Sequence, residues 1–191
     1  MILIFGDKYD VIVLGSLSID NFITVNSIKD QLKPGNKILI DKYITETGGG
    51  GGNAAATLAN FGLKVKLISK IGDDENSEFL KQRLKSKKII LEGLKSKKYD
   101  TAFSLIIVGK KDQDRIALSH KGASDHLSIN DFSMKKINSS WIYLGTMLGE
   151  SFKTAEKVVE HAFKKRIKIL FNPSTYLASK GKEGLYKLLK Y

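Results

Sequence analysis

One stretch decides how this chain folds: Gly48-Gly-Gly-Gly-Gly-Asn53-Ala-Ala-Ala56. The alanine-rich residues 54–61 predict a helix directly after the glycines, and Gly62 supplies its C-terminal stop. Each glycine costs about 0.5–1 kcal/mol relative to alanine in regular structure, so we expect a role for the run beyond packing. Glycine lets backbone N–H groups approach a ligand closely, here at the positive end of the following helix. The run therefore predicts a binding loop for an anion or a polyol, rather than a flexible linker.

The two common nucleotide-binding glycine motifs do not fit this run. A P-loop needs Gly-Lys-Ser/Thr after its spacer, where this chain has Asn53-Ala54. A Rossmann fingerprint should follow the first strand directly, but the segment Gly15–Asp20 (GSLSID) holds one glycine. The glycine run therefore needs a different explanation from either motif.

Strands and helices are predicted to alternate on both sides of the glycine run. Apolar runs typical of buried strands lie at residues 10–15, 65–69, 141–145 and 167–171. Helical patterns lie at residues 54–61, 76–88, from the N-cap Ser151 onward, and 184–191. This βαβ spacing predicts a doubly wound α/β sheet, with Trp141 in its core. Residues 22–25, 37–45, 101–108 and 115–119 alternate like half-exposed strands, and predict a small attached sheet of antiparallel ribbons.

Composition narrows the class of protein. The net charge is +12, but only three of the 32 basic residues are arginine, the side chain best suited to phosphates and base edges, so we expect no nucleic-acid partner. The chain has no cysteine, which excludes disulfides and thiol chemistry. It has no long apolar run for a membrane span, and its start, MILIFGDKYD, lacks a signal-peptide pattern. These features predict a cytoplasmic protein.

Four short motifs follow one another along the chain: Leu14–Asp20 (LGSLSID), the glycine run, Gly62–Val65 (GLKV) and Ile71–Asp74 (IGDD). In order and spacing they resemble the N-terminal signature of the PfkB/ribokinase family of carbohydrate kinases. Lys121–Leu127 and Asn172-Pro-Ser also lie where such kinases have comparable segments. The resemblance implies that residues 1–191 form the N-terminal part of a ribokinase-like domain. It implies a doubly wound sheet, incomplete at the C-terminus, with a β-sheet lid at about residues 22–45 and 101–119.

The resemblance also implies a substrate site. Asp20 would accept hydrogen bonds from sugar hydroxyls, with Ser18 beside it. Gly49 and Gly50 would form the substrate-facing loop, and Asn53 would add a hydrogen-bonding amide. A lid residue, Phe103, would lie near the substrate. The predicted site is thus Ser18, Asp20, Gly49, Gly50, Asn53 and Phe103.

The family's catalytic motifs do not occur in this sequence. The late Gly-Ala-Gly-Asp, which supplies the base and the anion hole, and the Asn-x-x-Glu that organises metal and phosphate are both missing. Gly122-Ala-Ser-Asp125 lies too early in the chain to replace the first motif, so we do not predict Asp125 as the base. His120, His126 and His161 lack metal-ligand spacing. We therefore predict no catalytic residue and no metal ligand in this chain.

The implied parent activity is ATP- and Mg²⁺-dependent phosphorylation of a sugar or nucleoside hydroxyl, with the ATP and Mg²⁺ sites largely absent here. We expect the chain to supply substrate recognition and to be inactive alone. Three hypotheses stay open. The chain is a fragment of a kinase, half of a split kinase whose C-terminal half is a separate chain, or a non-catalytic module for sugar binding or dimerisation. The resemblance further implies a homodimer formed through the lid.

Overall fold

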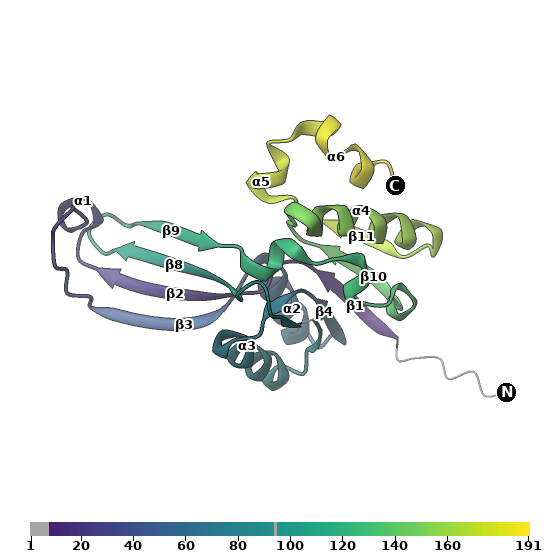
Figure 1. Cartoon of the computed structure of the whole chain (residues 1–191), viewed down its shortest axis with the longest axis horizontal. Coiled ribbons are helices and arrows are strands. Elements are labelled where there is room, and N and C mark those ends of the chain that lie inside the picture. Colours follow the sequence, from purple (N-terminus) through teal and green to yellow (C-terminus); the bar gives the residue numbers. More distant parts are fainter. Residues whose placement is uncertain (1–7, 94) are drawn as a thin grey trace.

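The computed structural model describes residues 8–93 and 95–191, so the start of the chain discussed above lies largely outside it. A five-stranded sheet forms the body, in the order β11-β10-β1-β4-β6 (Figure 1). All its neighbouring strands run parallel. Its strands are β1 (Tyr9–Leu14), β4 (Val65–Ile68), β6 (Ile90–Glu92), β10 (Ser139–Leu144) and β11 (Lys168–Phe171).

Helices cover both faces of this sheet. The helices are α2 (Gly50–Asn60), α3 (Glu75–Ser86), α4 (Gly149–Lys164), α5 (Ser174–Ala178) and α6 (Gly181–Leu189). Side chains alternate along β1: Val11 and Val13 pack in one core cluster with α2 and α3, whereas Ile12 and Leu14 pack in a second cluster with α4 to α6. The predicted doubly wound α/β fold is confirmed.

A four-stranded sheet projects from the body (Figure 1). Its order is β3-β2-β8-β9, and the short helix α1 (Ile28–Gln31) lies at its tip. The prediction of antiparallel ribbons alone was incomplete, because the two central strands, β2 and β8, pair in parallel. The bounds also differ from those predicted, since pairing starts at the base of the sheet. The strands are β2 (Ser18–Val25), β3 (Lys42–Gly48), β8 (Ala102–Gly109) and β9 (Asp114–His120).

Short elements join the two sheets. A two-stranded pair, β5 (Ile71–Gly72) and β7 (Lys95–Ser96), lies beside the base of the projecting sheet, and three 3₁₀ turns follow β9. The turns span Gly122–His126, Ile129–Asp131 and Met134–Lys136. None of the helices in the described part of the chain is long and apolar enough to cross a bilayer.

Two predictions about single residues were wrong. Helix α4 begins at Gly149, so Ser151 is not its N-cap. The buried Ser151 Oγ instead accepts from Leu127 N and donates to Ser124 O, both at 2.7 Å, and so ties α4 to the first 3₁₀ turn. Trp141 is not core: it is 42% exposed, because α2 and α3 cover the middle of their face of the sheet and leave its β10 side open.

Candidate ligand-binding site

The glycine run packs the start of α2 against the turn between β1 and β2. Gly48 ends β3, Gly49 is the N-cap with φ +80°, and Gly50 opens the helix. A Cβ on Gly51 would lie 2.7 Å from Gly15 C, and one on Gly49 would lie 2.6 Å from Ser16 O. Real Cβ atoms do not approach backbone this closely, so close packing does explain most of the run. Gly50 is the exception, because a Cβ there would meet nothing within 4 Å.

The N–H groups at the start of α2 are bonded within the chain. Gly51 N and Gly52 N donate to Ser16 O at 2.9 and 3.1 Å, and Gly50 N donates to Ser16 Oγ at 3.2 Å. The prediction that the run presents these donors to a ligand is therefore wrong for Gly51 and Gly52. At these two positions the helix start is bonded to the turn between β1 and β2.

A row of polar side chains crosses the base of the projecting sheet. Asp20 on β2 pairs in register with Ser104 on β8, and Ser104 pairs with Ser119 on β9. Residues that pair directly opposite each other on neighbouring strands project to the same face, so these three side chains lie on the same side of the sheet. Ser18 Oγ donates to Asp20 Oδ1 at 3.1 Å and holds the half-buried carboxylate in place.

This row and the start of α2 enclose a cavity of about 260 Å³. Five of the six predicted site residues line it, and Phe103 does not, because as the neighbour of Ala102 and Ser104 it lies on the other face of β8. There Phe103 is 5.3 Å from the His120 ring. The lining residues are Ser16, Ser18, Asp20, Gly49, Gly50, Asn53, Ala102, Ser104, Ser119, His120, Lys121 and Ser124.

The sequence interpretation found Ser18 but missed Lys121 and the other four serines of the lining, Ser16, Ser104, Ser119 and Ser124. The alternation along residues 101–108 was visible, but it does not say which strand lies beside Asp20. The lining offers hydroxyls, one amide and one carboxylate within a small volume. Such a set can donate to and accept from several hydroxyls at once, so it suits a polyol.

A smaller cavity, of about 180 Å³, adjoins the first and shares Ser16, Gly50 and Lys121 with it. Leu148 and Asp125 line it, whereas the neighbouring Met147 is buried in the core. Burial raises the pKa of the Asp125 carboxyl, and the nearby positive charges of Lys121 and His126 act against this rise. Thr146 and Ser174 complete the polar part of the lining, joined by a hydrogen bond of 2.8 Å.

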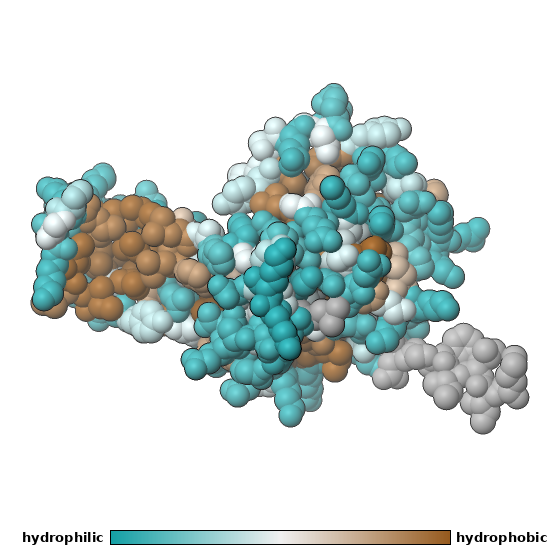
Figure 2. All heavy atoms as spheres, in the orientation of Figure 1, coloured by the Kyte–Doolittle hydropathy of each residue, from teal (hydrophilic) through white to brown (hydrophobic). Residues whose placement is uncertain are grey.

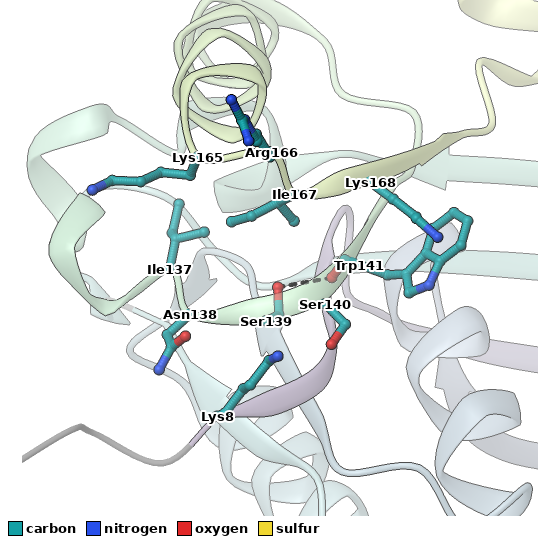
Figure 3. A pocket seen from close by; sticks show the side chains of 10 residues that line it. All are labelled: Lys8, Ile137, Asn138, Ser139, Ser140, Trp141, Lys165, Arg166, Ile167 and Lys168. Carbon is teal, nitrogen blue, oxygen red and sulfur yellow. Dashed lines mark hydrogen bonds between the residues drawn. The ribbon is translucent and has the colours of Figure 1, made fainter.

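Another cavity, of about 540 Å³, lies at the opposite end of the parallel sheet (Figure 3). It surrounds the N-terminal ends of β10 and β11, and its charged side chains are Lys8, Lys165, Arg166 and Lys168. Ligands of open α/β sheets bind at the carboxyl ends of the strands. We therefore place the candidate site at the 260 Å³ cavity, which lies just beyond the carboxyl end of β1.

Within residues 8–93 and 95–191, no group of three or more His, Asp or Glu side chains could hold a metal ion.

Residues 8–190 match the pfkB family of carbohydrate kinases. The chain is 27% identical to 5-dehydro-2-deoxygluconokinase from Listeria monocytogenes serovar 1/2a over 151 residues, which are 75% of this chain and 44% of the relative. It is 30% identical to the bifunctional protein HldE of Campylobacter jejuni subsp. jejuni serotype O:2 over 91 residues, 47% of this chain and 19% of that protein. The chain spans less than half the length of either relative.

Solved structures share the fold. A probable sugar kinase from Rhizobium etli CFN 42 superposes with a TM-score of 0.81 at 17% identity, covering 96% of this chain and 62% of its own. Ribokinase from Cryptococcus neoformans var. grubii serotype A, solved in complex with ADP, superposes with a TM-score of 0.76 at 24% identity. The match covers 96% of this chain and 56% of the ribokinase chain. At these identities the likeness establishes the ribokinase-like fold.

Proposed function

Because the chain belongs to the pfkB family of carbohydrate kinases, we propose that it binds the sugar or nucleoside acceptor of an ATP-dependent phosphoryl transfer to an alcohol. The observation that carries this proposal is the 260 Å³ cavity, where Asp20 lies among serines and an amide. The family match supports the reaction class, and the ADP complex of the Cryptococcus ribokinase supports ATP as the donor.

In this proposal the residues of the cavity bind and orient the acceptor. Asp20 accepts hydrogen bonds from sugar hydroxyls, and its bond from Ser18 fixes the carboxylate. Asn53, in the first turns of α2, adds a donor and an acceptor. The projecting sheet acts as the lid, which excludes water from the bound acceptor.

ATP and Mg²⁺ would supply the transferred phosphoryl group and neutralise its charge. The described residues contain no group of three or more His, Asp or Glu side chains that could hold a metal ion, and we assign no step at the phosphoryl group to them. We propose that the chain alone does not catalyse phosphoryl transfer from ATP to an acceptor. The check is ADP formation from ATP, Mg²⁺ and each acceptor below, and measurable turnover by the purified chain would contradict the proposal.

The binding test is calorimetric titration of the whole chain with ribose, fructose, fructose 6-phosphate and adenosine. We expect at least one acceptor to bind, and Asp20→Asn to weaken that binding about tenfold, because it removes a charge-assisted hydrogen-bond acceptor. Asp114→Asn is the matched control, since Asp114 lies in β9 at the hairpin end and outside the cavity. Binding that Asp20→Asn leaves unchanged, or no binding at all, would contradict the proposed site.

A second candidate is a split kinase, whose catalytic segment lies on a separate chain. β11 is the last strand at one edge of the parallel sheet. Its Leu170 is 57% exposed, and an apolar cavity of about 390 Å³ lies beside it, lined by Phe163 and Leu189 among others. Open strand edges and apolar patches are typical of surfaces that another polypeptide covers. A chain carrying Gly-Ala-Gly-Asp should therefore form a stable complex with this one, and its failure to associate would count against the split form.

We further propose that the projecting sheet forms a homodimer. Figure 2 shows apolar side chains gathered over this sheet. Ile116 and Leu118 on β9 are exposed there, as is Tyr43 on β3, and all three lie on the same face as Phe103. Burying such a face in a second copy would remove an apolar surface from water.

A further inference from the structure

One positively charged side chain, that of Lys121, lines three adjoining cavities. Lys121, directly after β9, lines the 260 Å³ cavity, the adjoining 180 Å³ cavity and a third of about 350 Å³. The side chain is half-buried, and its Nζ lies 5.0 Å from the centre of the Tyr176 ring. A cation over an aromatic face keeps its charge available for a ligand, because the ring does not neutralise it. The third cavity also contains Lys98 and the stacked pair Tyr99 and His126.

The 260 Å³ cavity has few other sources of positive charge. His120 is its second basic side chain, but it is exposed and lies beside the Phe103 ring. The helix start provides little, because the N–H groups of Gly51 and Gly52 donate to Ser16 O. Lys121 is therefore the permanent cation of the site, opposite in sign to Asp20.

We propose that the acceptor carries an anionic group, a phosphate monoester or a carboxylate, and that Lys121 determines this specificity by binding it. The inference rests on the proposed function, since it concerns the acceptor of that same cavity. Asp20 and its serines recognise the hydroxyl-bearing part, and the ammonium of Lys121 recognises the anion. A neutral polyol would forgo the charge-assisted hydrogen bond that an anion makes with the half-buried ammonium, and would therefore bind more weakly.

The nearby acid does not cancel this charge at the cavity. Asp125 lines the two neighbouring cavities and not the 260 Å³ one. Lys121 is thus shared between the 260 Å³ cavity, which Asp125 does not line, and the 180 Å³ cavity, where Asp125 and Tyr176 lie beside it. The two charges in the cavity, one of each sign, would also orient the acceptor, because reversing it would place its anion against Asp20.

The test compares matched ligands by calorimetric titration of the whole chain. Fructose 6-phosphate and fructose differ by a phosphate monoester, and glucuronate and glucose differ by a carboxylate. We expect the charged member of at least one pair to bind about tenfold tighter, in keeping with one charge-assisted hydrogen bond. Lys121→Met, which keeps the aliphatic stem, should abolish the preference. Lys98→Met is the matched control, because Lys98 lines only the third cavity, and it should leave the preference intact.

Each other outcome overturns the inference in a distinguishable way. If charged and neutral sugars bind alike, or if Lys121→Met keeps the preference, Lys121 does not select an anion, while the proposed acceptor site stands. If inorganic phosphate alone binds through Lys121 and the sugar phosphate gains nothing over fructose, Lys121 holds a phosphate from elsewhere in the reaction. If none of the four sugars binds but ribose or adenosine does, the inference fails while the proposed acceptor site stands. If no acceptor binds at all, the inference fails together with the proposed function.

Discussion

Gly48 and Asp20 lie against each other at the base of the projecting sheet, so closely that a Cβ on Gly48 would be 2.0 Å from Asp20 Cγ. Gly48 ends β3 opposite Ser18, and Ser18 donates to the same carboxylate at 3.1 Å. The absence of a side chain at Gly48 is therefore what allows the Asp20 carboxylate to occupy the rim of the cavity.

The first prediction follows from this contact. Gly48→Ala should displace the Asp20 carboxylate and weaken acceptor binding about tenfold, because a hydrogen-bond acceptor moves out of position. Gly145→Ala is the matched control: a Cβ there would make only ordinary contacts, the nearest with Gly15 Cα at 3.6 Å, and Gly145 does not line the 260 Å³ cavity. Titration calorimetry of both variants checks the effect. Equal weakening by both substitutions would refute the role of the Gly48–Asp20 contact, because Gly145 lies outside the cavity.

A second prediction concerns Asp74, which joins α3 to the base of the projecting sheet. Its side chain caps α3 by accepting from Ser77 N at 2.9 Å, and also accepts from Thr101 N at 2.7 Å and Thr101 Oγ1 at 2.6 Å. Asp74→Ala should lower the free energy of unfolding by about 2 kcal/mol, through the lost cap and the unpaired Thr101 groups. Chemical denaturation measures this change.

Asp73→Ala is the control for that experiment, because the neighbouring Asp73 pairs only with the exposed Lys95. Exposed ion pairs contribute about 0–1 kcal/mol, so this variant should be close to the unmodified chain. A loss in Asp73→Ala as large as that in Asp74→Ala would refute the special role of the cap.

The third prediction is a pH dependence of stability. Burial acts to raise the pKa of Asp74, but hydrogen bonds from Thr101 and Ser77 outweigh it and hold that pKa below the ordinary value of 3.8. A carboxyl with a lowered folded-state pKa stabilises the fold above its unfolded pKa, and the stabilisation is lost as pH falls through the folded value. The midpoint denaturant concentration should therefore decrease as the pH is lowered below about 4. The fall should be smaller in Asp74→Asn, and an identical acid profile in that variant would contradict this explanation.

The fourth prediction tests the proposed dimer. Leu118 is 54% exposed in the middle of β9, so Leu118→Lys should place a charge inside a dimer formed through this sheet and shift it to monomer. Leu39→Lys is the control, because Leu39 is 88% exposed in the segment before β3 and outside the strand ladder. Light scattering after size exclusion measures the mass. A dimer that tolerates Leu118→Lys, or a monomeric unmodified chain, would exclude this interface.

Local pattern was enough to predict most of the elements. The apolar runs at residues 10–15 and 65–69 became β1 and β4, and the pattern at residues 76–88 became α3. The periodicity of apolar residues, and the glycine and capping signals at helix ends, depend only on residues near one another in the sequence. They can therefore be recognised without knowledge of the fold. Trp141 shows the limit of local pattern. Its apolar strand predicted a buried side chain, but exposure depends on which helices cover the strand, and neither α2 nor α3 covers Trp141.

By itself, the sequence determined the order of strands, helices and motifs, the family they point to, and the residues Asp20 and Asn53 as site candidates. Only the tertiary structure decided that β2 and β8 pair in parallel, which brings Ser104 and Ser119 into a row with Asp20. It also decided that the glycines serve packing against Gly15 and Ser16, and that Lys121 reaches the same cavity. The physical reason is that local propensity acts between neighbours along the chain, whereas strand partners, close backbone contacts and shared cavities arise between segments far apart in sequence.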